Sequence, residues 1–444
     1  MAGEWPSVPL SDVADLLTGH PFKSQYYTDN PLDPRLVGGD NIAQGQIRWE
    51  NVRRWPRDMV TGLDDYWLKP GDVVLAMDRP WIDAGLKRAA MSAADLPALL
   101  IQRTARLRGS DRLDVGFLRY IIGSRAFTQY VLGVQTGTAV PHISPAQIRA
   151  FRFPLPPLNE QRRIALILGA LDDKIELNRK MNETLEAMAR ALFKSWFVDF
   201  DPVRAKAEGR APNGMDAEAA KLFPSEFVES ELGPIPTGWR QTTLGPEVQR
   251  CGGSIQTGPF GSQLHASDYV PSGVPVVMPK DIVGRRVSAH SIARIREADA
   301  ARLSRHRLEP GDVVYSRRGD VERHALVSKR EAGWLCGTGC LLVRPGYGWP
   351  SGAFLSFALD HPETRAWIVR RAIGATMPNL NTGILGSVPL CVAPDAVMRA
   401  FSRVVDPIQA MIGARALEAS SLADARDQLL PRLLAGELDP GGVE

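Results

Sequence analysis

The sequence predicts an α+β protein in which one structural unit, a mixed domain followed by a long helical segment, occurs twice. Two observations lead to this fold class. Segments about 240 residues apart match each other, and fixed-period similarity is the sequence signature of a repeated architecture. A long stretch in the middle of the chain, residues 158–200, is rich in helix formers and contains no proline, which is unusual for an ordinary globular helix.

Three pairs of matching segments carry the repeat. They are Leu68–Val74 (LKPGDVV) with Leu308–Val314 (LEPGDVV), Gly137–Ile143 (GTAVPHI) with Gly374–Leu380 (GATMPNL), and Phe153–Leu155 with Val388–Leu390. Trp5 near the start similarly corresponds to Trp239. The same order of motifs therefore occurs in both halves of the chain, and each half should fold in the same way.

Each half begins with a globular part of mixed character. Short β-type runs, among them Asp72–Ala76 and Gly311–Tyr315, alternate with turn clusters. A short helix is predicted in each half, at Gly116–Tyr130 and at Gly352–Arg371. We therefore expect an α+β domain with a curved sheet in each half.

The central segment has the apolar spacing of an amphipathic helix. Its stripe consists of Ile164, Ile167, Leu168, Leu171, Ile175, Met181, Leu185, Met188 and Leu192. These steps of three and four residues place the side chains on one face. If about 36 residues are helical, the helix is ~54 Å long, and its apolar stripe requires a partner.

The C-terminal region offers a second, weaker stripe. A shift of about 237 residues sets Phe401, Ile408, Leu422 and Leu429 opposite Ile164, Leu171, Leu185 and Leu192. Pro407 and Pro431 are expected to kink or bound this helix. In the first stripe, Asn178 and Asn182 have two interpretations: a buried asparagine that fixes the register of a helical seam, or a residue on a solvated flank.

Bulk properties limit the possible classes. A chain of 444 residues is expected to form two or more domains. No apolar run approaches the ~18 residues of a membrane span. The start, MAGEWPSVPL, lacks the pattern of a secretory signal. Of the four cysteines, only Cys336 and Cys340 are close in sequence, and no second close pair of Cys or His accompanies them as a zinc site would require. Free thiols in a reducing cytoplasm are therefore favoured, and we expect a cytoplasmic protein without a bound metal.

Charge is distributed unevenly along the chain. Net charges are +2 for residues 1–157, −3 for 158–236, +7 for 237–394 and −3 for 395–444. The globular parts are therefore basic and the helical parts acidic, which suits a nucleic-acid ligand at the globular parts. The excess in the first globular part is slight.

Catalytic motifs expected of a DNA-modifying enzyme are missing from the sequence. It contains no Asn/Asp-Pro-Pro-Tyr/Phe motif of adenine methyltransferases, no G-x-x-x-x-G-K-[ST] phosphate loop and no Glu-x-Lys triplet of a common nuclease site. The seven histidines are not paired at metal-ligand spacing. We therefore expect a chain that is not itself an enzyme.

The order of these features resembles the specificity subunit of type I restriction-modification systems. The most specific part is residues 154–203, PLPPLNEQRRIALILGALDDKIELNRKMNETLEAMARALFKSWFVDFDPV, which begins at the end of the first globular part. GHPFKSQYY at Gly19–Tyr27, GPFGSQLHASDY at Gly258–Tyr269 and both PGDVV segments also match. The resemblance covers nearly the whole chain.

This resemblance implies two repeated α/β target recognition domains separated by two long antiparallel helices, a coiled-coil-like spacer with pseudo-two-fold symmetry. The domains follow as residues 1–157 (target recognition domain 1), 158–200 (central helix), 201–236 (linker), 237–394 (target recognition domain 2) and 395–444 (C-terminal helix). Each domain would read one half of a bipartite double-stranded DNA target, and helix length would fix the distance between the halves.

Partners and cofactors follow from the same resemblance. Two methylation subunits would dock on the helices and domains, and restriction subunits would join that core. The chain itself would hold no cofactor, with S-adenosylmethionine, ATP and Mg bound by the partner subunits. The helix residues expected in the seam or in docking are Ile164, Leu168, Leu171, Ile175, Leu185, Leu192, Phe193, Trp196, Phe197, Phe401, Ile408, Leu422 and Leu429. Phe193, Trp196 and Phe197 could instead pack back on a domain.

Loops that follow strands supply the candidate DNA-binding residues. In the first domain they are Lys23, Ser24, Gln25, Tyr26, Arg79, Trp81, Lys87 and Arg88. In the second domain they are Ser262, Gln263, His265, Tyr269, Arg317, Arg318 and Arg323. Arg can bond a guanine edge in bidentate fashion and Gln an adenine edge, but Arg also serves as a phosphate contact or a surface charge. Trp81 could be a core residue, and His142 and Asn379 could simply close a turn.

A protein-binding scaffold is the alternative function. Two globular modules would grip other proteins, and the helices would act only as spacers. Salt-sensitive, sequence-specific binding to a split duplex would favour DNA recognition, whereas indifference to DNA would favour the scaffold.

Overall fold

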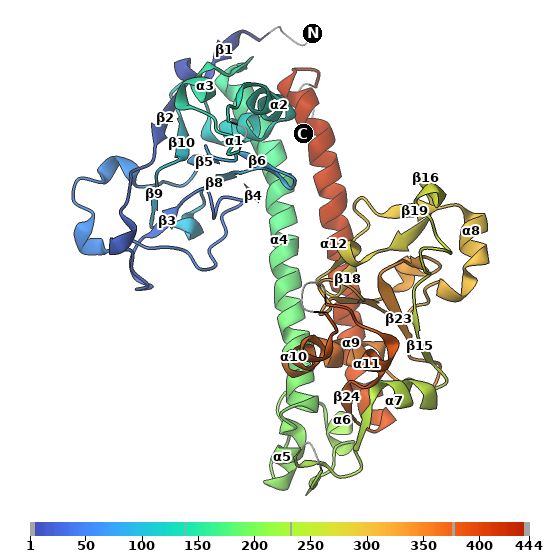
Figure 1. The fold of residues 1–444 in the computed structure, drawn as a ribbon. Coiled ribbons are helices and arrows are strands. Elements are labelled where there is room, and N and C mark those ends of the chain that lie inside the picture. Colours follow the sequence, from blue (N-terminus) through green and yellow to red (C-terminus); the bar gives the residue numbers. More distant parts are fainter. Residues whose placement is uncertain (1–4, 138, 231–232, 375–377, 439–444) are drawn as a thin grey trace. The chain divides into compact units, whose positions relative to one another are not determined.

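The computed structural model describes residues 5–137, 139–230, 233–374 and 378–438 (Figure 1). The chain forms two compact units. Unit 1 comprises Met1–Lys180 and Arg415–Glu444, and unit 2 comprises Met181–Ala414. Two helices of 40 residues, α4 (Leu158–Phe197) and α12 (Asp395–Leu434), contribute one half to each unit.

Unit 1 contains a five-stranded sheet with the strand order β2-β10-β5-β8-β4. Its strands and helices are β1 (Ser7–Pro9), β2 (Ala14–Thr18), β3 (Arg35–Val37), β4 (Gln44–Gly45), β5 (Val73–Ala76), β6 (Trp81–Ile82), β7 (Gly85–Leu86), β8 (Arg88–Ala90), β9 (Ala98–Leu100), β10 (Thr104–Gly109), α1 (Val115–Gly123), α2 (Arg125–Val134), α3 (Pro145–Ala150) and β11 (Arg152–Pro154). The side chains of β5 are all buried, as the apolar PGDVV segment predicts.

Unit 2 contains a four-stranded sheet with the order β15-β23-β20-β21 and a three-stranded sheet with the order β19-β16-β22. Its elements after α4 are α5 (Asp201–Ala207), α6 (Ala217–Lys221), β12 (Phe227–Val228), β13 (Ile235–Pro236), β14 (Arg240–Thr243), α7 (Leu244–Arg250), β15 (Ser254–Thr257), β16 (Tyr269–Val277), β17 (Ile282–Val283), β18 (Arg286–Val287), β19 (Ala293–Ile295), α8 (Glu297–Arg302), β20 (Val313–Ser316), β21 (His324–Leu326), β22 (Leu335–Cys336), β23 (Cys340–Arg344), α9 (Gly352–Asp360), α10 (Pro362–Arg371), α11 (Thr382–Gly386) and β24 (Pro389–Val392).

The two units repeat the same frame. β2, β10, β5 and β8 correspond to β15, β23, β20 and β21, with antiparallel pairing between each pair of neighbours. β1 and β11 pair as β14 and β24 do, and α1–α3 correspond to α9–α11 in order. The predicted α+β repeat is therefore confirmed.

In unit 1 the halves of α4 and α12 pack antiparallel. Arg426 Nη1 donates to Asp172 Oδ1 at 2.9 Å, and Asn178 Nδ2 donates to Glu418 Oε2 at 2.9 Å, so the pairing runs in opposite directions along the two helices. Asn178 is buried, which confirms its interpretation as a seam residue. Ile164 and Leu168 are fully buried in the core of unit 1 together with Leu433.

In unit 2 the helix pair ends in a cluster of aromatic side chains. Asn182 Nδ2 donates to the Ile412 carbonyl at 3.3 Å. Phe193, Trp196 and Phe197 are buried and pack around Phe401. Their ring centroids lie 6.1, 5.9 and 5.0 Å, respectively, from the ring centroid of Phe401. Of the two interpretations of these aromatics, the structure shows the second: they pack into the core of unit 2 and are not exposed.

The seam differs from the sequence expectation in its register. The constant shift predicted Ile164 opposite Phe401, yet Ile164 packs in unit 1 and Phe401 packs with Phe193 to Phe197 in unit 2. The shift describes the repeat, whereas two antiparallel helices bring together residues whose numbers have a constant sum. The remaining seam residues (Leu171, Ile175, Leu185, Leu192, Ile408, Leu422 and Leu429) are half-buried.

The two prolines of α12 do not bound the helix. The sequence predicted that Pro407 and Pro431 would kink or bound this helix. Both lie within Asp395–Leu434, so the boundary alternative was wrong. Both are exposed, and the Arg403 carbonyl that loses its helical partner at Pro407 can be hydrated. The buried stripe continues past Pro407 through Val405 and Ile412.

Candidate nucleic-acid interface

The sheet of each unit brings the candidate loops to one edge. In unit 1, β2 and β5 are both antiparallel to β10 and therefore parallel to each other, so both end at the same edge. Residues 23–26 follow β2, and residues 79–88 follow β5. In unit 2, β15 and β20 flank β23 in the same way, so residues 262–269 and 317–323 leave from one edge.

Matching backbone hydrogen bonds hold these loops in both units. The amide of Gly19 donates to the Thr104 carbonyl at 3.0 Å, and that of Gly258 donates to the Cys340 carbonyl at 2.9 Å. A Cβ at Gly19 would lie 2.0 Å from the Ile101 carbonyl oxygen, and one at Gly258 would lie 2.1 Å from that of Gly337. No side chain fits either position, which explains why both loops begin with glycine.

The loop after the buried strand is held in a second matched way. In unit 1 the Met77 amide donates to the Arg103 carbonyl at 2.9 Å, and the Arg79 amide to the Pro141 carbonyl at 2.6 Å. In unit 2 the Arg317 amide donates to the Gly339 carbonyl, and the Gly319 amide to the Pro378 carbonyl, at 2.8 and 3.1 Å. Arg79 thus corresponds to Gly319, and Arg103 to Gly339.

His142 and Asn379 close turns through their backbones. His142 exchanges two backbone hydrogen bonds with Thr136, and Asn379 exchanges two with Ile373, all between 2.7 and 3.0 Å. His142 Nδ1 also lies 2.6 Å from Asp78 Oδ1. Thr138 and residues 375–377 of the two matching glycine-rich segments lie outside the described residues.

The aspartate of each PGDVV segment is buried and paired in the same manner. Asp72 accepts two bonds from Arg108, from Nε at 2.7 Å and from Nη2 at 2.8 Å. Asp312 accepts two from Arg344, at 3.0 and 2.7 Å. These bidentate pairs fix the start of the buried strand, and hydrogen bonding to the carboxylate raises the pKa of both guanidinium groups.

The first-domain candidates differ in exposure. Lys23, Ser24, Gln25, Tyr26, Arg79 and Trp81 are exposed, and Lys87 is half-buried. Arg88 lies differently, because a Cβ at Gly123 would be 2.4 Å from its Nη2. Its guanidinium is enclosed beneath α1, and burial lowers its pKa. Arg88 is half-buried, and this contact with α1 gives it a packing role in the sheet.

Several second-domain candidates have structural roles. Gln263 Oε1 accepts from the Phe260 amide at 3.1 Å, and His265 caps the turn that begins after it, with its amide bonded to Asp268. Tyr269 is half-buried and pairs with Ile295 at the start of β16. Ser262 and His265 are the two exposed residues among the candidates of this loop.

Arg317, Arg318 and Arg323 differ among themselves. Arg317 is half-buried, Arg318 is exposed, and exposed Arg323 donates from Nε to Asp320 Oδ2 at 2.5 Å. Within the described residues, Arg318 makes no ion pair. Arg318 is therefore the arginine of this loop that is best placed to meet a ligand.

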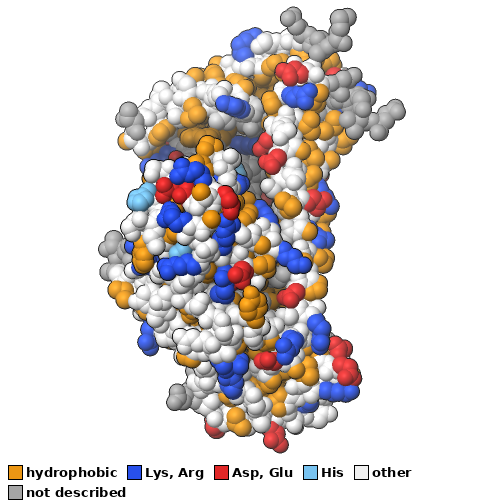
Figure 2. All heavy atoms as spheres, turned by 90° about the vertical axis from the view of Figure 1, so that its right-hand side faces the viewer, with side chains coloured by type: hydrophobic (Ala, Val, Ile, Leu, Met, Phe, Trp, Pro, Cys, Tyr) orange, Lys and Arg blue, Asp and Glu red, His pale blue; other side chains and the backbone are white. Residues whose placement is uncertain are grey.

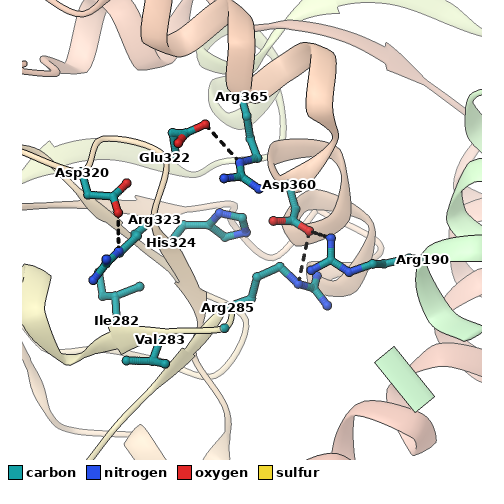
Figure 3. A pocket seen from close by; sticks show the side chains of 11 residues that line it. Arg190, Ile282, Val283, Arg285, Asp320, Glu322, Arg323, His324, Asp360 and Arg365 are labelled. Atoms are coloured by element: carbon teal, nitrogen blue, oxygen red, sulfur yellow. Dashed lines mark hydrogen bonds and ion pairs between the residues drawn. The ribbon is translucent and has the colours of Figure 1, made fainter. Parts of the chain in front are cut away.

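A polar pocket of about 360 Å³ lies beside this loop in unit 2 (Figure 3). Arg190 and Arg285 point to the carboxylate of Asp360, and Arg365 points to Glu322 (Figure 3). His324 is buried between them, and burial lowers its pKa to about 3, so it is neutral. Glu186 also pairs with Arg190 and Arg285, and Asp320 pairs with Arg323. The four arginines are thus matched by four carboxylates, which leaves no excess positive charge to bind phosphate.

Charge alone does not mark the interface on the molecular surface. Figure 2 shows basic and acidic side chains interspersed over the face that it draws.

Among the described residues, no group of three or more His, Cys, Asp or Glu side chains could hold a metal ion, and no helix is both long and apolar enough to span a bilayer. The four cysteines are free thiols.

Sequence reasoning missed Asp78, Arg103 and Arg365. Arg103 belongs to none of the sequence motifs and lies in the turn between β9 and β10. It comes beside Asp78 because β10 pairs with β5. The one available signal was the repeat itself, which sets Arg103 against Gly339.

The geometry combines a duplicated sheet, exposed loops at one edge of each copy and a long helix after each copy. A family model, the type I restriction modification DNA specificity domain, matches residues 107–187. The solved S subunit of the type I restriction-modification system of M. genitalium has the same fold, with a TM-score of 0.58, 16% identity, and 97% of this chain and 96% of that one covered.

The chain is related to the specificity subunits of type I restriction enzymes, which confirms the resemblance found in the sequence. It is 27% identical to the HindI specificity subunit of Haemophilus influenzae over 72% of this chain and 77% of that protein. It is 34% identical to the MjaVIII specificity subunit of Methanocaldococcus jannaschii over 41% of this chain, and 35% identical to the EcoAI specificity subunit of Escherichia coli over 40%. Those two matches span 43% and 29% of the relatives' lengths.

Proposed function

We propose that this chain is the sequence-specific DNA-recognition subunit of a type I restriction-modification complex. Each domain would read one half of a bipartite target, and partner subunits would carry out methylation and cleavage. The observation that supports this most is the duplicated frame with different side chains on its two equivalent loops. Since Arg79, Trp81 and Lys87 stand where the other unit has Gly319 to Arg323, the two half-sites should differ in sequence.

The chain would act without catalysis of its own. Two methylation subunits and the restriction subunits would supply the reactions, and S-adenosylmethionine, ATP and Mg would bind to those partners. This division agrees with the missing catalytic motifs. In the chain itself, exposed Arg and polar side chains at the sheet edge would contact phosphates and base edges.

The partners would dock on apolar residues of the long helices that point away from the seam. The buried Phe193, Trp196 and Phe197 are excluded as anchors, because they lie in the core of unit 2. In unit 1, Leu166 and Leu177 of α4 are 74% and 50% exposed. They are 11 residues apart, which is close to three helical turns and puts them on one face. Large exposed apolar side chains on a common face mark a protein-interaction surface.

Docking is tested by replacing the two exposed leucines. The variant Leu166→Glu with Leu177→Glu should fail to co-purify with the methylation subunit, while its melting temperature stays close to that of the wild type. The matched control Arg162→Glu also changes charge on an exposed position of α4 and should co-purify normally. Normal assembly of the double variant would contradict docking at this face.

DNA recognition is tested by mapping methylated adenines in cells that produce the chain with its methylation partners. The proposal predicts a split motif, and duplexes carrying it should bind the purified complex with strong salt dependence. Indifference to DNA would instead support the protein-binding scaffold.

A further inference from the structure

The two equivalent loops differ in length. From Ala76 to Arg88 the chain advances 12 positions, whereas from Ser316 to His324 it advances 8. The ends correspond, because Val74 pairs with Ala89 as Val314 pairs with Ala325. Unit 1 uses the four additional residues to form the β6–β7 hairpin, which unit 2 lacks.

The hairpin exposes two large apolar side chains. Trp81 is 38% exposed and Ile82 is 41% exposed, and Trp81 pairs with Leu86 across the hairpin. The adjacent apolar residues Met77 and Leu86 are buried. An insertion that leaves Trp and Ile in water gains nothing for the fold, so a binding role is the better explanation.

Two arginines beside the hairpin adopt left-handed backbone conformations. Arg79 has φ = +45° and Arg103 has φ = +63°. Their counterparts, Gly319 and Gly339, have φ = +73° and +87°. The frame therefore requires a positive φ at both positions, and unit 2 meets that requirement with glycine. Unit 1 keeps arginine at a cost of about 1–2 kcal/mol each, and strain of this kind concentrates at functional sites.

Two arginines beside the hairpin are accessible to a ligand. Asp78 accepts from Arg103 Nη1 at 3.0 Å and also lies against His142. Arg103 is 75% exposed despite this pair. Within the described part of the chain Arg79 has no ion pair, and its charge is felt by the half-buried Lys87. Asp40 acts on Lys87 as well, and Asp83 lies in the turn of the hairpin, so the total charge is balanced. The unpaired Arg79 and the exposed Arg103 nevertheless leave two guanidinium groups that can contact phosphates.

We propose that Arg79, Trp81, Ile82 and Arg103, here called the hairpin surface, enter the DNA duplex and open one base step within a half-site. The inference rests on the proposed DNA-recognition function. Trp81 and Ile82 would act as the apolar wedge, and the arginines would hold the flanking phosphates. Because unit 2 lacks the hairpin, its half-site would be read without unstacking.

The unstacking is tested with 2-aminopurine, whose fluorescence rises when it leaves the base stack. The complex of the chain with its methylation partners is bound to duplexes that carry the mapped target. The probe occupies successive positions of each half-site other than the methylated adenines, because methyltransferases flip those bases out of the stack themselves. Wild-type complex should raise the fluorescence within one half-site only. The variant Trp81→Ser with Ile82→Ser should bind with that rise lost, and a rise that persists in this variant would overturn the proposal.

The arginines are tested by giving unit 1 the glycines of unit 2. The variant Arg79→Gly with Arg103→Gly should melt no lower than the wild type, because relief of backbone strain offsets the added freedom of the unfolded chain. Its DNA binding should weaken, and the slope of log K against log salt should fall by about 2. The control Ser291→Gly, at an exposed residue with φ = +56°, should change neither.

The outcomes separate the two proposals. If the wild-type complex shows no specific DNA binding, the proposed function itself fails. If it binds its target tightly but produces no fluorescence rise in either half-site, or if the glycine variant keeps its full salt dependence, DNA recognition stands and the hairpin inference is wrong.

Discussion

The two units share a backbone frame, and in each a network of polar side chains joins this frame to the long helices. The central residue of that network, here called the hub, is an acid in unit 1 and a base in unit 2. In unit 1 the centre is an acid, Asp172 of α4. It accepts bonds from Arg119 at 3.0 Å, from the Tyr120 hydroxyl at 2.7 Å and from Arg426 at 2.9 Å. The half-buried Arg88 lies close enough for this carboxylate to counter the lowering of its pKa by desolvation.

In unit 2 the centre is a base, Arg285, in the turn between β17 and β18. It donates to Glu186 Oε1 at 3.0 Å and to Ser356 Oγ at 3.1 Å, and its guanidinium lies 3.8 Å from the centre of the Phe357 ring. Asp360 faces it at 3.7 Å. Its side chain is 6% exposed, against 28% for Asp172.

The comparison teaches what a duplicated domain preserves. Ser356 and Phe357 occupy the positions of Arg119 and Tyr120, and His324 occupies that of Arg88, yet the backbone hydrogen bonds of the two frames match. The repeat keeps the glycines that begin the loops, the turns and the paired aspartates. Other side chains differ, among them Arg79 and Arg103, which replace Gly319 and Gly339. Because the hub of unit 2 is more deeply buried, its loss should cost more.

The largest expected effect is the loss of the hub of unit 2. Arg285→Ala leaves Glu186 and Asp360 without their buried partner and should destabilise unit 2 by about 3–5 kcal/mol. Urea denaturation measures the loss, and hydrogen exchange should place it in unit 2. The control Arg318→Ala removes an exposed arginine and should stay within about 0.5 kcal/mol of the wild type. Equal effects of the two variants would refute the hub.

A smaller effect is expected at the hub of unit 1. Asp172→Asn removes the carboxylate that serves Arg119 and Arg426 and should cost about 2–3 kcal/mol, less than the other hub because Asp172 is partly solvated. The adjacent Asp173→Asn alters an exposed carboxylate and provides the control. The same urea titration compares the two variants. If Asp172→Asn lowers the free energy of unfolding as much as Arg285→Ala does, the solvent exposure of the central residue does not govern its contribution to stability.

The smallest effect is a pH dependence confined to unit 2. His324 is fully buried and its folded pKa of about 3 lies below the ordinary value for histidine. The unfolded chain therefore binds one more proton between about pH 6.5 and pH 3. The free energy of unfolding decreases as the pH is lowered through that window. From pH 6.5 to 5 this amounts to at most about 2 kcal/mol.

The substitution His324→Gln removes this titrating ring. The loss of stability between pH 6.5 and 5 should be smaller in that variant than in the wild type, with exposed His290→Gln as the control. Arg88, at the equivalent position of unit 1, does not titrate in this range, so amides of unit 1 should show no matching change. An unaltered pH slope in His324→Gln would contradict the assignment.

Much of the fold could be predicted because its signals are local. The apolar period of residues 158–200 predicted α4, and PGDVV predicted both buried strands. The candidate loops follow those strands as expected. Long-range properties were not accessible: burial of Arg88 depends on the missing side chain of Gly123, and burial of Trp196 depends on the packing of Phe223 and Phe401 around it.

Register and strain were also beyond the sequence. A constant shift identifies repeats but cannot state which residues of two antiparallel helices meet, so Ile164 and Phe401 were wrongly set opposite each other. The left-handed conformation of Arg79 has no signal of its own. It becomes visible only when the structure aligns it with Gly319.

The account depends on two equivalent loops that read different halves of one target, and a map of methylated adenines tests this most directly. DNA is sequenced from cells that produce the methylation partners with either the wild-type chain or Arg79→Gly with Arg103→Gly. We predict a split motif with unlike halves for the wild type, and a motif relaxed or lost in one half only for the variant. A continuous motif, or equal changes in both halves, would contradict the account.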